Sequence, residues 1–265
     1  MINPYSALAQ HFSFISPTIY KSRFYKKLIQ LNKNNIFERN IEPELLWLKD
    51  FLPQKAIFFD IGAGNGDYIY FLDYLLFPEN IYAFEPNKKL CKRLKNLFSK
   101  INFFPIALSD ENLSGILSFP IIDKEEFPEK STLNPISADE DTKVFTQKVE
   151  VCKLDDWANK REFLRLDFIK IDVVGHELKV LEGAKETIQK FEPTLMVKIE
   201  QKHYEQDIWE VIKEIEKLDY SAHYLCRENF ILKPLQANIL EEKNKDLNEE
   251  NSRYIKNFIF IKNSK

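Results

Sequence analysis

The sequence lacks the features that mark zinc proteins, disulfide-bonded domains and membrane-spanning proteins. Its three cysteines, Cys91, Cys152 and Cys226, lie far apart and form no C-x-x-C pair, which argues against a zinc site or a disulfide framework. No run approaches the roughly 18 consecutive apolar residues that span a bilayer. The N-terminus also lacks the basic and then apolar segments of a signal peptide. We therefore expect a cytoplasmic protein with reduced thiols.

An excess of positive charge is also missing. The chain has 38 Lys and Arg residues against 41 Asp and Glu residues, a net charge of −3, and the two signs are interspersed. Nucleic-acid-binding domains usually present a basic patch, so we expect no nucleic-acid partner. The length of 265 residues and the hydrophobic content of 44% suit a soluble globular protein. A core domain with an added arm is favoured over one large domain.

Glycine is scarce, and residues 1–50 contain none. Apolar residues recur there at helical spacing, at positions 24, 28 and 31 and again at 45, 48 and 52. This spacing predicts an N-terminal helical arm over residues 1–50, which is a candidate contact for a homo-oligomer. A basic and aromatic cluster at positions 20–27 is typical of a solvated helix face, with a membrane surface or a partner as the alternative.

Three of the six glycines gather in one turn, after the apolar run Ile57–Phe59. Gly62, Gly64 and Gly66 permit a sharp turn and a close approach of a ligand to the main chain. Their G-x-G-x-G spacing differs from the G-x-G-x-x-G of dinucleotide-binding proteins. Asp60, directly before them, would repel a pyrophosphate but attract the ammonium group of a methionine moiety.

A second apolar run, Ile81–Phe84, ends on Glu85. At the carboxyl end of a neighbouring strand, a carboxylate can accept hydrogen bonds from both hydroxyls of a ribose. The two turns together predict a pocket for a nucleotide-type small molecule, and the glycine spacing favours S-adenosylmethionine over a nicotinamide cofactor.

Strands and helices alternate from residue 56 onward, which predicts an α/β fold with a parallel sheet covered by helices. Residues 111–156 are less regular, and a polar, proline-containing loop at 122–141 is long enough to be a substrate or lid loop. The predicted strands are 56–59, 81–84, 101–104, 115–119, 148–154, 168–173, 193–199, 230–232 and 258–261; the predicted helices are 68–76, 88–98, 177–189 and 208–218, with an exposed helix or loop at 240–253.

Six motifs occur in an order that resembles the FkbM family of S-adenosylmethionine-dependent methyltransferases, over residues 56–200. The resemblance implies a Rossmann-like class I methyltransferase fold for residues 51–265, with helices on both faces of a mainly parallel central sheet. It also implies O-methylation, often of sugars, glycans or other secondary metabolites. The motifs are Asp60–Ala63, Glu85-Pro86, Ala107–Asp110, Ser131–Leu133, Leu154–Asp156 and Phe168–Glu177.

A cofactor site follows from the same resemblance. The first strand and its turn would hold the methionine part of S-adenosylmethionine, the acid after the second strand would hold the ribose, and the segment after the third strand would border the adenine. The expected cofactor-binding residues are Asp60, Gly62, Ala63, Gly64, Asn65, Gly66, Tyr68, Glu85, Pro86, Ala107, Leu108, Ser109 and Asp110.

The chain departs from the family pattern at a few positions. The family commonly has an acid where Val174 stands and often an acid at Lys198, and an Asn is usual at the position of Gly64. If either acid binds substrate or a metal in relatives, this protein makes a different contact there. Hard cations prefer several oxygen ligands, so the loss of an acid at Val174 favours methyl transfer without a metal.

Methyl transfer requires an acceptor oxygen that is aligned with the methyl group and relieved of its proton. His176 is the first candidate for the general base, because imidazole titrates near neutral pH. Asp172 would orient His176, act as the base or bind a metal, and His203 is a weaker catalytic candidate. A helix-capping role for His176 and a structural role for Asp172 are the alternatives. The residues expected to contact the acceptor are Ser131, Thr132, Lys170 and Glu200.

The favoured function is therefore O-methylation of a carbohydrate hydroxyl, on a nucleotide sugar or a surface glycan. One alternative keeps the enzyme but changes the acceptor to a phosphorylated or amine-bearing metabolite. Another is a degenerate family member that binds the cofactor without turnover. The residues at 174 and 198 motivate it, and the intact Asp60, Glu85, Asp172 and His176 oppose it.

Overall fold

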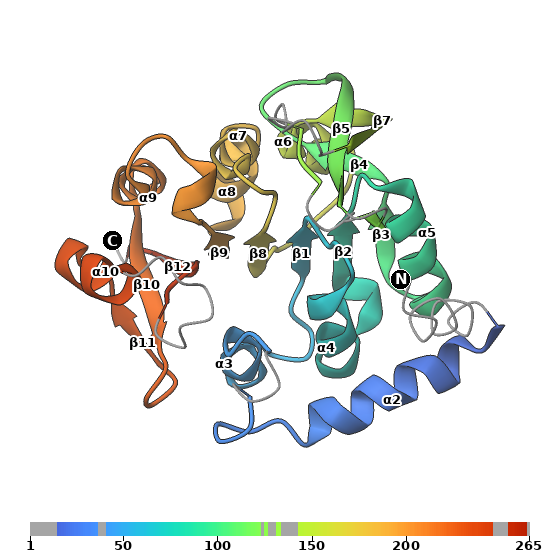
Figure 1. The fold of residues 1–265 in the computed structure, drawn as a ribbon, viewed down its shortest axis with the longest axis horizontal. Coiled ribbons are helices and arrows are strands. Elements are labelled where there is room, and N and C mark those ends of the chain that lie inside the picture. The colour runs from blue at the N-terminus through green and yellow to red at the C-terminus, as the bar shows by residue number, and fades with distance from the viewer. Residues whose placement is uncertain are drawn as a thin grey trace.

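The computed structural model describes residues 15–36, 41–122, 125–126, 131–133, 143–245 and 254–263. An eight-stranded sheet in the order β11-β10-β12-β9-β8-β1-β2-β3 runs through its centre (Figure 1). The strands β1, β2, β3, β8 and β9 are parallel, and β12 is antiparallel to both β9 and β10. The strands are β1 Phe58–Ile61, β2 Ile81–Phe84, β3 Asn102–Phe104, β8 Phe168–Ile171, β9 Thr194–Lys198, β10 Tyr220–Cys226, β11 Ile231–Pro234 and β12 Asn257–Lys262.

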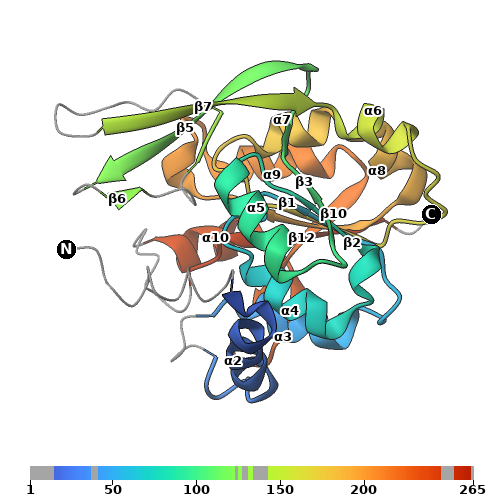
Figure 2. The ribbon, with the colours of Figure 1, turned by 90° about the vertical axis from the view of Figure 1, so that its right-hand side faces the viewer.

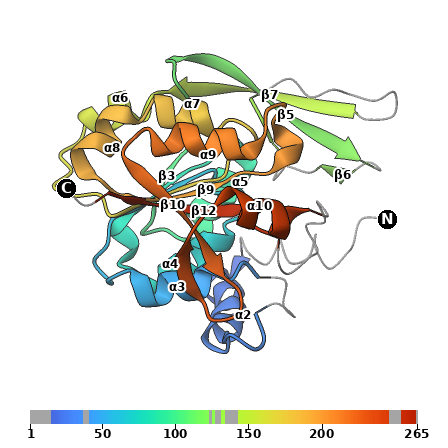
Figure 3. The same ribbon diagram turned by 90° about the vertical axis from the view of Figure 1, so that its left-hand side faces the viewer.

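Helices cover both faces of this sheet, because its central strands are apolar on both sides (Figures 2 and 3). One face packs against α6 Leu154–Asn159, α7 Glu177–Glu182, α8 Lys185–Phe191 and α9 Ile208–Glu216. The other packs against α3 Glu44–Phe51, α4 Asp67–Leu75 and α5 Lys88–Leu97.

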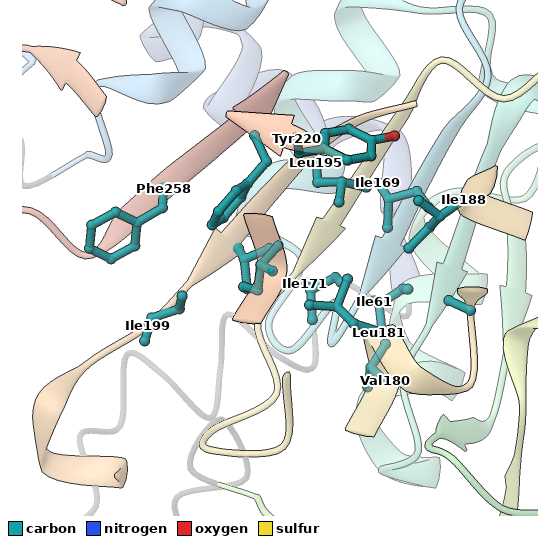
Figure 4. Packing of buried hydrophobic residues seen from close by; sticks show 14 of the residues in the cluster. Ile61, Ile169, Ile171, Val180, Leu181, Ile188, Leu195, Ile199, Tyr220 and Phe258 are labelled. Carbon is teal, nitrogen blue, oxygen red and sulfur yellow. The ribbon is translucent and has the colours of Figure 1, made fainter. Parts of the chain in front are cut away.

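Alternate residues along each strand enter these two cores. Phe58 and Phe168 stack with ring centroids 4.9 Å apart on the α3–α4 side. Ile61, Ile169 and Ile171 point toward α7 and α8 on the other side, as Figure 4 shows. The sheet is thus held from both faces, and its carboxyl edge is left for function.

The N-terminal arm contributes α2 Pro17–Ile29 and α3. Helix α2 lies across α4, where Lys21 Nζ pairs with Asp73 at 3.2 Å and the Tyr25 hydroxyl donates to the same carboxylate. Ile19 and Ile29 stay exposed on the arm, in the segment where the sequence predicts an oligomer contact. No helix within the described ranges is long and apolar enough to cross a membrane.

A second sheet, in the order β4-β7-β5-β6, begins with the strand that follows β3 in the chain. Its long antiparallel pair extends beyond the helices in Figures 2 and 3. Thr132 bridges to Ser118 of this sheet, and Leu133 packs on its small apolar cluster. The strands are β4 Ile106–Leu108, β5 Leu113–Ile122, β6 Glu125–Glu126 and β7 Lys143–Cys152, and helix α10, Ala237–Asn244, precedes β12 in the central sheet.

The predicted α/β fold with a mainly parallel sheet and helices on both faces is confirmed. Several element boundaries were wrong. Residues 113–122 and 143–152 form longer strands than predicted, residue 154 begins α6, and strand β10 was missed. The predicted helix 177–189 breaks into α7 and α8 at Gly183, where a Cβ would lie 1.9 Å from the carbonyl oxygen of Ser109. Most of the predicted loop 122–141 lies outside the described residues.

Asp155 of the Leu154–Asp156 motif holds this break in place. Its carboxylate accepts hydrogen bonds from the backbone N–H groups of Glu186 at 3.1 Å and Thr187 at 2.8 Å, at the start of α8. Its own backbone N–H donates to the carbonyl of Gly183 at 3.0 Å. The motif acid is therefore a helix cap that fixes α8 under the sheet.

We expect Asp155→Ala to lower the free energy of unfolding by about 1–2 kcal/mol, because two helix-start donors lose their acceptor. Urea denaturation measures the change. Asp156→Ala is the matched control, since that carboxylate accepts from Asn112 at an exposed site, and a change within about 0.5 kcal/mol is expected. Equal losses in both variants would contradict the capping role.

Candidate active site

The glycine turn after β1 is fastened between β2 and β8. The N–H groups of Gly62 and Ala63 donate to the carbonyl of Phe84 at 3.0 and 3.1 Å. Gly62 has φ +79°, and a Cβ there would lie 1.9 Å from the carbonyl oxygen of Asp172, so only glycine fits. Gly64 also has positive φ, but no described atom lies within 4 Å of its Cβ position. The turn thus offers main chain to a ligand at Gly64.

Glu85 lies buried at the end of β2, between two turns. Its Oε2 accepts from the N–H of Gly64 at 2.7 Å, and its Oε1 accepts from the N–H of Asn87 at 2.7 Å. Burial raises its pKa to about 7, although these two N–H donors oppose the shift. Each oxygen retains a lone pair, so the carboxylate can accept further hydrogen bonds from hydroxyls.

Asp60, at the end of β1, is completely buried and pairs with the buried Lys170 of β8. Asp60 Oδ1 lies 2.9 Å from Lys170 Nζ, whereas Oδ2 is buried with no hydrogen-bond partner among the described residues. Burial raises the pKa of Asp60, with Lys170 opposing it. Burial also disfavours the charged form of Lys170, but the attraction of Asp60 and Asp172 is larger and raises the pKa of that lysine.

The ion pair extends into a chain of alternating charges along the carboxyl edge. Asp172 Oδ2 lies 3.8 Å from Lys170 Nζ and 3.3 Å from Lys198 Nζ. Lys198 Nζ lies 3.8 Å from Oε1 of Glu42, a residue of the arm just before α3. Tyr68 donates its hydroxyl to Glu42 Oε2 at 2.6 Å. The arm is therefore part of the edge that carries the predicted site.

Glu42 is a residue that sequence reasoning missed. Burial raises its pKa, but Lys198 and Lys256 outweigh the burial and bring the pKa down to about 2. Lys256, just before β12, lies 3.4 Å from Glu42 Oε1. Its partners come from the opposite end of the chain, so no local pattern marks this acid.

His176 belongs to a separate set of contacts. Its Nε2 lies 2.8 Å from Ser109 Oγ, which lies 2.8 Å from Asp110 Oδ1. The single hydroxyl proton of Ser109 goes to the carboxylate, so Ser109 Oγ accepts from Nε2–H and the neutral imidazole has its lone pair on Nδ1. Burial, with Lys179, lowers the pKa of His176. The structure thus joins His176 to the Ser109–Asp110 segment and Asp172 to the lysines.

Glu177 organises the turn after β8 and was also missed. Its Oε1 accepts from the N–H groups of Val173 at 3.3 Å and Gly175 at 3.2 Å. Between them Val174 has φ +50°, a strained conformation for a β-branched residue. The Thr132 hydroxyl donates to the Val174 carbonyl at 3.3 Å, so the second sheet touches this turn. The Phe168–Glu177 motif contained the signal, since an acid two residues after a glycine turn can accept from its N–H groups.

A family model for the methyltransferase FkbM domain matches residues 60–226. The chain belongs to the FkbM methyltransferase family. The predicted membership is thus confirmed, and with it a methyltransferase domain whose cofactor is S-adenosylmethionine.

One relative of this FkbM methyltransferase is the 2-O-methyltransferase NoeI of Sinorhizobium fredii, which is 28% identical over 157 residues. The match covers 51% of this chain and 59% of NoeI. Among solved structures, methyltransferase FkbM from Methylobacillus flagellatus KT is 16% identical with a TM-score of 0.47, and the match covers 80% of this chain and 45% of that one. The plantazolicin methyltransferase BpumL in complex with SAH is 12% identical with a TM-score of 0.41, covering 97% and 95%.

The residues of the two turns fit S-adenosylmethionine. Asp60 offers a buried oxygen without a partner in the described chain, which suits an ammonium group. Gly64 leaves open space at its Cα, and Glu85 beside it can accept from hydroxyls.

The other predicted site residues have contacts of their own. Main-chain carbonyls of Asn65 and Pro86 accept from Arg93 and Gln147. Ala107 and Leu108 are buried in β4. Glu200 pairs with Lys202 at 3.1 Å, after β9, and its carbonyl accepts from the N–H of His203. Ser131 adjoins Thr132 at the second sheet. Among the described residues, no three His, Cys, Asp or Glu side chains gather to hold a metal.

The lowered pKa of His176 predicts a pH dependence of stability. The unfolded chain takes up a proton below its ordinary pKa of 6.5 and the folded chain does not. The contribution of His176 is therefore full above pH 6.5 and is lost as the pH falls. As the pH falls below 6.5, we expect the free energy of unfolding of the wild type to decrease by up to about 1.4 kcal/mol per pH unit relative to that of His176→Gln.

Urea denaturation of both proteins on either side of pH 6.5 measures this difference. The raised pKa of Glu85 acts in the opposite direction, but it is present in both proteins and cancels in the comparison. The same pH dependence in wild type and variant would show that His176 is not buried in its neutral form.

Proposed function

We propose that this protein transfers a methyl group from S-adenosylmethionine to a hydroxyl oxygen of a carbohydrate. The observation that supports it most concerns Asp172, whose main-chain carbonyl packs against the glycine turn that would hold the cofactor and whose carboxylate stays 26% exposed at the same sheet edge. The relative NoeI is a 2-O-methyltransferase, which supports transfer to oxygen. A carbohydrate acceptor is proposed because polar side chains of the second sheet reach this edge.

Cofactor binding is assigned to three groups. Asp60 Oδ2 would accept from the ammonium of the methionine part, Glu85 from the ribose hydroxyls, and the Ser109–Asp110 segment would border the adenine. When bound, S-adenosylmethionine supplies an electrophilic methyl group on a sulfonium. The buried acids along this edge match that positive charge.

Asp172 is proposed as the group that accepts the proton, or a strong hydrogen bond, from the acceptor hydroxyl. Its side chain is 26% exposed, and its contacts with Lys170 and Lys198 use Oδ2. The two lysines fix the orientation of the carboxylate. His176 is the second candidate for the base, through Nδ1, with His203 as a third. We propose that transfer needs no metal ion.

Binding of S-adenosylmethionine in the micromolar range, without binding of NAD, is the first expected result, and calorimetry measures it. Glu85→Gln should weaken cofactor binding by about 1.5–3 kcal/mol, because one acceptor oxygen toward the ribose is lost. With a pKa of about 7 for Glu85, wild-type affinity should rise as the pH rises through this value and the carboxylate ionises. Unchanged affinity in Glu85→Gln would remove the ribose assignment.

Catalytic roles are separated by three variants assayed with a chelator present. Asp172→Asn should lower kcat by about 10²–10⁴-fold and change cofactor affinity much less. His176→Gln should lower kcat similarly if His176 is the base, whereas Ser109→Ala should not. If His176 instead positions Ser109 and Asp110, both variants should weaken cofactor binding in parallel. Full activity of Asp172→Asn would exclude Asp172 as the proton acceptor. Loss of wild-type activity when the chelator is added would contradict metal-free transfer.

The acceptor class is tested by incubating the protein and the cofactor with nucleotide sugars, glycans, phosphorylated metabolites and amines. Mass spectrometry should show methyl gain on saccharides, absent with Asp172→Asn. Methyl gain confined to phosphorylated or amine-bearing compounds would favour the alternative acceptor. Cofactor binding without any methyl gain would favour a degenerate member of the family.

A further inference from the structure

The second sheet presents one face toward the candidate active site. In β5 and β7, Leu117 lies opposite Gln147, and Phe119 lies opposite Phe145. Opposed residues of an antiparallel pair point to the same face, so these four side chains share what we call the inner face. Leu117 packs there in the cluster that anchors the hairpin on β4.

Two hydrogen bonds join the second sheet to the carboxyl edge of the central sheet, and the one from Gln147 comes from the inner face. Gln147 Nε2 donates to the carbonyl of Pro86, directly after the buried Glu85, at 3.0 Å. Thr132, paired with Ser118 of β5, donates to the carbonyl of Val174 at 3.3 Å. The second sheet therefore joins the ribose turn to the turn after β8, on either side of the proposed reaction site.

Phe145 is the exception on this face, because it is 45% exposed. It rests on Phe119, which is 3% exposed, with ring centroids 5.0 Å apart and an angle of 32° between the planes. Phe145 is two residues along β7 from Gln147, about 7 Å farther out from the ribose turn. This step is close to the width of one sugar ring, so an acceptor held beyond the proposed ribose position would meet the exposed ring.

We infer that Phe145, supported by Phe119, is a stacking platform for a pyranose ring of the acceptor. A pyranose has C–H groups on its faces and hydroxyls around its rim, so it buries a face on an aromatic ring while polar groups meet the rim. Gln147, two residues along β7 on the same face, supplies such a polar group next to the platform. The inference rests on the proposed function and narrows its substrate class to saccharides with an accessible C–H face.

The test compares variants with the saccharide found to be methylated by the wild type. Phe145→Ala and Phe145→Leu should each lower kcat/KM for that saccharide by about 10- to 100-fold, mainly through KM, because neither offers a flat aromatic face. Phe145→Trp should stay within a few-fold of wild type. Ile116→Ala is the matched control, since Ile116 is 61% exposed on the opposite face of the same hairpin. The affinity for S-adenosylmethionine should be unchanged in all four.

A wild-type kcat/KM in Phe145→Leu, or equal losses in Phe145→Leu and Ile116→Ala, would overturn the platform while leaving saccharide methylation established. A wild type that binds S-adenosylmethionine but methylates no saccharide overturns the proposed function, and the platform with it. The two failures are thus told apart by the wild-type protein alone. Leu at 145 keeps an apolar contact with Phe119, so a loss in that variant is not a folding defect if its melting temperature matches the wild type.

Discussion

The buried ion pair between Asp60 and Lys170 is the contact on which the carboxyl edge depends. Its atoms lie 2.9 Å apart between neighbouring central strands, and both side chains are almost fully buried. Removing two charges from water costs several kcal/mol per ion, so such a pair persists only with further compensation. Lys170 obtains it from Asp172 and the carbonyl of Gly62, whereas Asp60 keeps one oxygen without a partner in the described chain. The edge is thus left incomplete at the position where a positively charged group of the cofactor is proposed to bind.

One chain of contacts leaves this pair through Asp172, and a separate set of contacts includes His176. One runs through Lys198 to Glu42 and ties the N-terminal arm to the sheet. The other holds Ser109, Asp110 and His176 together at the start of α7. The second sheet meets the edge from above, at the carbonyls of Pro86 and Val174. The cofactor and the acceptor are thus proposed to bind to different groups. The acids of the carboxyl edge would hold the cofactor, and the inner face of the second sheet would contact the acceptor.

The local parts of this structure were predictable from the sequence, and the long-range parts were not. The runs ending at Asp60 and Glu85 are apolar and bounded by turn residues, so strand and turn were both visible. Strand β10 was missed because Tyr220–Cys226 mixes polar and apolar residues and follows a helix after a short connection. The break at Gly183 depends on Asp155 and Ser109, and the place of Glu42 depends on residues near the other terminus. Contacts between residues this far apart in the sequence produce no periodic pattern from which they could be predicted.

Lys198 stands where the family often has an acid, and the structure gives this departure a physical reason. An acid at that position would lie beside Asp172 and Glu42, and three neighbouring carboxylates would repel one another. The lysine instead lies between the two acids, which raise its pKa against the opposing effect of burial. A site damaged by random substitution would leave such a charge without partners. Here the cation at 198 is matched by an acid from the arm, so the arm and the sheet edge form one electrostatic unit.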